Sequence, residues 1–130
     1  MKIFLDTANI ASIKMYNDMG LVDGITTNPS LLAKEGGDPQ KTMEEIVRIV
    51  KGDVSLEVIA TDASGMVEEG RRLRKYGKNV VVKCPLTPDG LKACRILTDE
   101  GIPVNVTLCF STNQAILAAK SGAKYISPFI

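Results

Sequence analysis

Apolar runs and helix-like periodicity alternate along the whole chain. Apolar runs predict six strands, at residues 2–7, 23–28, 54–59, 79–84, 103–109 and 124–130. Between them, apolar residues recur at three- and four-residue intervals, which predicts helices at 10–19, 30–35, 39–51, 64–76, 88–99 and 112–120. The clearest helix is 39–51, in which Met43, Ile46, Val47 and Val50 fall on one face.

Strands that alternate with helices indicate βαβ units and a parallel sheet. The continuous apolar run 80–82 is typical of a strand covered on both faces. Two architectures fit, a (β/α)8 barrel and a doubly wound open sheet. The dinucleotide fingerprint and the phosphate-binding GxxxxGK[ST] loop are both missing, which disfavours nucleotide-binding open sheets but leaves a flavodoxin-like sheet open. With no linker or low-complexity stretch, we expect residues 1–130 to form a single domain.

The charge balance excludes several classes of partner. The chain has 16 basic and 15 acidic residues, so we expect no nucleic-acid partner. The basic run 71–75 follows Glu68 and Glu69 by about one helical turn, where ion pairs can form. No apolar run reaches the about 18 residues that span a bilayer, so we expect no membrane partner.

Cysteine and histidine usage narrows the chemistry. The three cysteines lack metal-like spacing and indicate a reducing, cytoplasmic setting, in keeping with a start that has no signal-peptide pattern. Histidine is absent, which removes Ser-His and Cys-His nucleophiles and most zinc sites. Catalysis would therefore depend on Lys, Asp, Glu, Thr, Ser or Tyr.

Polar or reactive residues recur near the carboxyl ends of the predicted strands. They are Asp6, Thr26, Asn28, Glu57, Lys83, Asn105, Thr107 and Ser127. Parallel strands bring these ends to one rim, where barrels build their active sites. Each residue also has a structural alternative: Asn28 before Pro29 suits a helix N-cap, and the hydroxyls and amides can satisfy backbone groups.

Lys83 is the most reactive member of this set. It follows three valines, so it either extends its ammonium group to solvent at the strand end or lies desolvated within the barrel. Desolvation favours the neutral amine, which can attack a carbonyl and form an imine. Asp6 and Glu57 could then supply acid and base for cleavage of a carbon–carbon bond. This chemistry needs no metal and no organic cofactor.

Six segments together resemble the transaldolase family. They are FLDTAN (4–9), DGITTNPSL (23–31), VSLEVIATD (54–62), VVVKCPLTPDGLKA (80–93), NVTLCFS (105–111) and YISPF (125–129). The similarity is to the small-subunit branch, shared with fructose-6-phosphate aldolase, and it covers essentially the whole chain. It implies a TIM-type (β/α)8 barrel with about six βα units in this chain.

The resemblance also implies catalytic roles for four residues. Lys83 would form the Schiff base, and Asp6 would take a proton during carbon–carbon cleavage. Glu57, with Thr107 and a water molecule, would transfer protons around the imine. The implied reaction moves a dihydroxyacetone unit from sedoheptulose 7-phosphate to glyceraldehyde 3-phosphate, giving erythrose 4-phosphate and fructose 6-phosphate, in the pentose phosphate pathway.

Four further residues are implied to bind the sugar-phosphate substrates. Asn28 and Asn105 would orient the lysine and substrate hydroxyls, Thr26 would support the site, and Ser127 would contact the dihydroxyacetone unit. Glu57, Ser127 and Phe129 resemble the transaldolases, because the aldolases carry Gln, Ala and Tyr at these places. An aldolase-like activity and a catalytically silent barrel fragment acting in assembly remain alternatives.

The resemblance implies that the barrel extends beyond this sequence. The chain stops in the sixth predicted strand, whereas a closed barrel needs about 200–250 residues. In the family, a Gly-Arg pair follows the SPF motif and its arginine binds the substrate phosphate. We expect the protein to be a homo-oligomer, and the 130-residue chain alone to aggregate or associate and to have little activity.

Overall fold

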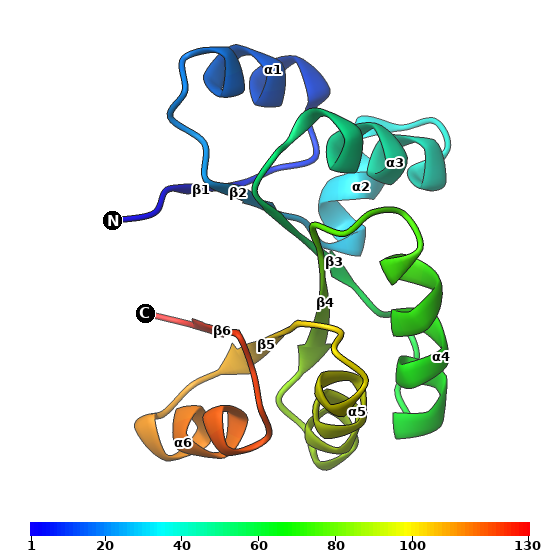
Figure 1. Ribbon diagram of the computed structural model, residues 1–130, viewed down its shortest axis with the longest axis vertical. Coiled ribbons are helices and arrows are strands. Elements are labelled where there is room, and N and C mark those ends of the chain that lie inside the picture. The colour runs from blue at the N-terminus through cyan, green and yellow to red at the C-terminus, as the bar shows by residue number, and fades with distance from the viewer. The chain divides into compact units, whose positions relative to one another are not determined.

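The computed structural model describes residues 1–130, which form six strands and six helices (Figure 1). One helix follows each of the first five strands, except that two helices, α2 and α3, follow β2. The strands are β1 Phe4–Asp6, β2 Gly24–Thr26, β3 Asp53–Glu57, β4 Val80–Pro85, β5 Val104–Cys109 and β6 Tyr125–Pro128. The helices are α1 Ile10–Asp18, α2 Pro29–Glu35, α3 Pro39–Ile49, α4 Ala63–Arg74, α5 Pro88–Asp99 and α6 Thr112–Lys120. None of these helices is long and apolar enough to cross a membrane.

The strand order in the sheet follows the order of the chain from β1 to β6. The pairs β1–β2, β2–β3, β4–β5 and β5–β6 are parallel, which confirms the parallel sheet that the alternating pattern predicts. A doubly wound sheet would reverse its strand order at a switch point. The uninterrupted order therefore favours the barrel over the open sheet.

The chain divides into two compact units. The first comprises Met1–Glu57 with Tyr76–Val80, and the second comprises Val58–Lys75 with Val81–Ile130. The first unit holds β1 to β3 and α1 to α3. The second holds α4 to α6, β5, β6 and all of β4 after its first residue. That residues 1–130 form a single domain stays a prediction.

In the first unit, three short strands pair under α1 and α3. Ile25 on β2 and Val54 on β3 are register partners, and both are fully buried. Ile46 and Val47 of α3 are buried as its periodicity predicts, and α3 contacts α1. Gly24 is required on β2, because a Cβ atom there would lie 2.6 Å from the Asp53 carbonyl oxygen.

One side-chain amide holds together three carbonyl groups in the first unit. Asn79 Nδ2 donates hydrogen bonds to the carbonyl oxygens of Val47 (3.1 Å), Val50 (2.7 Å) and Gly52 (3.1 Å). These carbonyls line the end of α3 and the turn into β3, where no helical N–H remains to bond them. Asn79 thus fixes the connection between α3 and β3 to the segment that precedes β4.

We expect Asn79→Ala to lower the free energy of unfolding by about 2–3 kcal/mol, because several half-buried carbonyls lose their donor. Asn79→Asp should lower it further, since it places a carboxylate against three carbonyl oxygens. Urea denaturation of the two variants and the wild type measures both effects. An aspartate variant as stable as the wild type would show that the amide bonds contribute nothing.

The second unit has a continuous apolar core between its strands and helices. Its fully buried members are Val82, Cys84, Ala93, Cys94, Leu97, Val104, Val106 and Ala118. Helices α4 and α5 pack on each other, and Gly70 of α4 lies against the Leu97 side chain, where a Cβ atom would come within 2.9 Å of it. Arg71 of α4 forms an ion pair with Glu100 at the end of α5, and this pair lowers the pKa of Glu100.

The predicted boundaries of the helices and strands lie close to the observed ones, and the strand ends are the least accurate. The strands expected at 2–7 and 23–28 are only three residues each, although backbone pairing continues past them: Thr7 N donates to Thr26 O at 3.1 Å. The helix expected from residue 30 begins at Pro29, because Asn28 caps it. In α1, Ile13 is buried and Asn17 is half-buried, whereas Tyr16 is exposed.

Candidate active site

The first unit brings two predicted site residues together. Asp6 and Thr26 end β1 and β2 and are register partners. Thr26 Oγ1 donates a hydrogen bond of 2.8 Å to Asp6 Oδ1. This bond fixes the orientation of an exposed carboxylate.

Asn28 is the N-cap of α2. Its Oδ1 accepts a hydrogen bond from Leu31 N at 2.9 Å, and Pro29 occupies the first helical turn. The capping alternative for Asn28 is therefore confirmed. The amide nitrogen of this side chain is not used by the cap and can donate to a ligand.

Glu57 is half-buried and ends β3. Ser55 lies two residues earlier, so it shares the face of Glu57, and it is only 1% exposed. Ser55 was not among the residues predicted from the sequence, although it lies two residues before Glu57. The buried Thr27 serves the backbone, because its hydroxyl donates to Ser55 O at 2.8 Å.

In the second unit, Lys83 lies in a cluster of buried polar residues. Lys83 is 8% exposed, Asn105 2% and Thr107 7%. Lys83 and Asn105 are register partners on β4 and β5, and Thr107 pairs with Pro85 two residues further along the strands. This burial favours the desolvated alternative for Lys83 over extension into solvent.

Ser127 orients the amide of Asn105. Its hydroxyl donates a hydrogen bond of 2.9 Å to Asn105 Oδ1. Because the carbonyl of the amide is held by Ser127, the NH2 group is the part that Asn105 presents to other groups. Two of the predicted binding residues are thus hydrogen-bonded to each other. Ser127 is therefore more than a turn residue before Pro128.

A β-bulge follows Thr107. Val106 pairs with Ile126 but Cys109 pairs with Pro128, so β5 contains one more residue than β6 over this stretch. Leu108, the extra residue, has φ +61° and is the only non-glycine residue with positive φ. Such strain collects at functional sites. Beyond the bulge, Phe110 stacks on Phe129 with ring centroids 4.9 Å apart.

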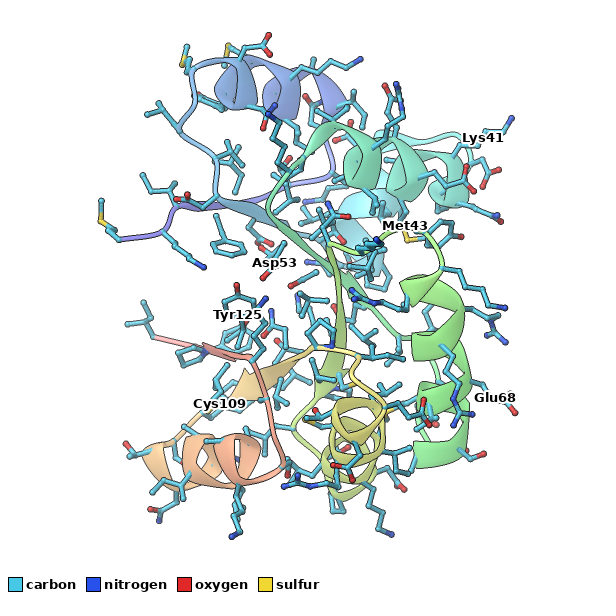
Figure 2. The ribbon with its side chains drawn as sticks, in the orientation of Figure 1. Lys41, Met43, Asp53, Glu68, Cys109 and Tyr125 are labelled. Carbon is cyan, nitrogen blue, oxygen red and sulfur yellow. The ribbon has the colours of Figure 1, made fainter.

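Tyr125 on β6 was not among the residues predicted from the sequence. It is half-buried, pairs in register with Asn105, and shares the face of Ser127 two residues later. Figure 2 shows its ring on the side of β6 opposite α6. In the sequence, Tyr125 could have been found from its position two residues before Ser127.

The chain contains no group of three metal-binding side chains of the His, Cys, Asp or Glu type. None of the three cysteines forms a disulfide, and all are buried. Burial raises the pKa of Cys94, which keeps this thiol protonated at neutral pH. The chemistry available at the strand ends is therefore that of an amine, carboxylates, amides and hydroxyls.

Among solved structures, the fold is similar to the carboxyl transferase domain of Rhizobium etli pyruvate carboxylase with oxamate and biotin. The TM-score is 0.65 at 15% sequence identity, covering 97% of this chain and 26% of that one. A second structure of the same domain, with pyruvate, gives a TM-score of 0.62 at 15% identity and the same coverage. At this identity the likeness concerns the fold alone.

Curated relatives match the whole chain. A probable transaldolase of Nitrosopumilus maritimus is 75% identical over 130 residues, and those of Dinoroseobacter shibae and Methanococcus vannielii are each 60% identical. These alignments cover 100% of this chain but only 59–60% of the relatives' length.

The family comparison agrees with the resemblance of the six motifs. Residues 3–130 match the family described as Transaldolase/Fructose-6-phosphate aldolase. With the strand order β1 to β6, this match identifies a partial (β/α) barrel, as predicted. The chain belongs to the transaldolase/fructose-6-phosphate aldolase family.

Proposed function

We propose that the protein containing this chain is a transaldolase that transfers a dihydroxyacetone unit between sugar phosphates through a Schiff base on Lys83. The proposal rests mainly on the burial of Lys83. Lys83 is the register partner of Asn105, and Ser127 orients the Asn105 side chain. Because the chain spans about 60% of its relatives, the proposal concerns the whole protein. It places the enzyme in the cytoplasm as a homo-oligomer of the pentose phosphate pathway.

The reaction begins at the amine of Lys83. Its lone pair attacks the ketose carbonyl at C2, and the resulting carbinolamine loses water to give a protonated imine. The bond between C3 and C4 then breaks, and its electron pair moves into the imine to form an enamine. The proton leaves the C4 hydroxyl for Asp6, and the aldose phosphate departs. Addition of the enamine to an acceptor aldehyde reverses these steps, and hydrolysis frees Lys83.

The remaining site residues support this chemistry. Glu57, with Thr107, moves the protons that accompany formation and hydrolysis of the carbinolamine. Thr26 supports the proposal for Asp6, because its hydrogen bond holds the carboxylate in one orientation. The amide nitrogens of Asn28 and Asn105 donate to substrate oxygens, and Ser127 contacts the dihydroxyacetone unit.

The family also contains fructose-6-phosphate aldolases, which keeps free-aldolase activity as the second candidate function. In that reaction the enamine is protonated and dihydroxyacetone leaves instead of reacting with an acceptor. Glu57, Ser127 and Phe129 favour transfer, because each matches the transaldolase pattern. An assay with fructose 6-phosphate and no acceptor distinguishes the two activities.

Borohydride trapping tests the proposal directly. We expect the full-length protein, incubated with fructose 6-phosphate and borohydride, to gain one three-carbon adduct per chain on Lys83, because reduction makes the imine irreversible. Peptide mass spectrometry locates the adduct, and a sample without sugar phosphate is the control. An active preparation that carries no adduct, or carries it on another lysine, would exclude the mechanism.

A further inference from the structure

A carboxylate on α4 holds two consecutive backbone amides after β3. Glu69 Oε2 accepts a hydrogen bond from Ile59 N at 2.7 Å, and Glu69 Oε1 accepts one from Ala60 N at 3.0 Å. Hydrogen bonds to an ionised acceptor are about twice as strong as neutral ones. We call this pair of bonds the Glu69 clamp.

The clamp acts on the connection between β3 and α4, which begins directly after Glu57. At the start of this connection, Val58 N donates to the carbonyl oxygen of Lys83 at 3.1 Å. At its end, Ala63 N lies 3.4 Å from Asp89 Oδ1. The residues next to Glu57 are thus joined to the backbone of Lys83 on one side and to Glu69 on the other.

Of the side chains in the connection, Val58 is buried in the core and Ala60 packs against that core. Ile59 is 75% exposed, so its side chain anchors nothing. Without Glu69, the amides of Ile59 and Ala60 would lose these acceptors. The clamp therefore adds a second attachment to the connection, beyond the one at Val58.

We propose that Glu69 is a positioning residue for Glu57, acting through the backbone of residues 58–60. The inference rests on the proposed function, in which Glu57 transfers protons around the imine. The sequence suggested only that Glu68 and Glu69 pair with the basic run at 71–75. In the structure Arg71 pairs with Glu100, and the Glu69 carboxylate is engaged by the clamp.

The first measurement compares steady-state kinetics of full-length variants. We expect Glu69→Ala to lower kcat about tenfold while KM changes less than twofold, because proton transfer rather than substrate binding is disturbed. The kcat of Glu69→Gln should lie between those of Glu69→Ala and the wild type, because glutamine offers one acceptor oxygen instead of two. The matched control is Glu68→Ala, whose side chain points away from α4 (Figure 2) and whose kcat should stay within twofold.

A double-mutant cycle then asks whether Glu69 acts through Glu57. In a Glu57→Gln background, Glu69→Ala should lower the remaining kcat less than twofold, because residues that act as one unit are not additive. A full tenfold loss in both backgrounds would overturn the proposal. If the alanine variant does not fold, Glu69→Gln serves in the same cycle.

Amide hydrogen exchange tests the clamp without any activity. The amides of Ile59 and Ala60 should be protected in the wild type and Glu68→Ala, and should exchange at least tenfold faster in Glu69→Ala. Equal exchange rates in all three proteins would overturn the proposal. If borohydride fails to label Lys83 while the exchange difference is present, the proposed function fails and the clamp stands.

Discussion

Replacing Lys83 with methionine should lower transaldolase turnover at least about a thousandfold, as losses of a catalytic nucleophile do. Methionine fills the space of the lysine stem but has no amine to attack a carbonyl. Because Lys83 is buried, removing its polar end should leave the free energy of unfolding unchanged or slightly higher. An inactive protein with undiminished stability separates a chemical defect from misfolding.

The measurements are a transaldolase assay, thermal unfolding and borohydride trapping on the same preparations. Lys92→Met is the matched control, because Lys92 is an exposed lysine on α5. It should keep full turnover and still form the adduct. A Lys83→Met protein that retains more than a tenth of the wild-type turnover would rule out Lys83 as the nucleophile.

We expect Glu57→Gln to lower transaldolase turnover about 100-fold, the usual scale for loss of a general acid or base. The same change should raise the release of free dihydroxyacetone relative to transfer. Glutamine keeps the size of glutamate but holds no exchangeable carboxyl proton, and it is the residue of the aldolase-like pattern. Assays with and without an acceptor aldehyde give the two rates.

Glu68→Gln provides the control for this substitution, since it removes one negative charge from an exposed position in the same chain. Its ratio of release to transfer should equal that of the wild type. If the ratio in Glu57→Gln is also unchanged, Glu57 does not determine the choice between the two activities.

The elements and their order could be predicted from the sequence because each depends on nearby residues. Thr87, Pro88 and Gly90 show this for α5: the Thr87 hydroxyl accepts a bond of 3.0 Å from Gly90 N, with proline in the first turn. Strand ends were less predictable, since pairing continues wherever a neighbouring strand supplies partners. Thr27 N bonds to Ser55 O at 3.1 Å although β2 ends at Thr26.

The polar residues of the strand ends could be named from the sequence, but their partners could not. The bond from Ser127 to Asn105 joins residues 22 positions apart, and its existence depends on the register of β5 and β6. In the sequence, Glu69 resembles any other charged residue on a helix surface. Its neighbours along the chain do not reveal the two backbone amides that donate hydrogen bonds to it. Contacts of this kind follow from tertiary packing rather than local pattern.

The extra residue at Leu108 makes β5 sensitive to its length as well as to its side chains. Deleting this one position would remove the bulge and let β5 pair evenly with β6, with Cys109 still opposite Pro128. Cys109, now buried with its thiol 3.4 Å from the Ser111 carbonyl oxygen, would take the place that follows Thr107. A substitution at Leu108 leaves the number of residues between the two pairs unchanged, whereas a one-residue deletion removes the bulge itself.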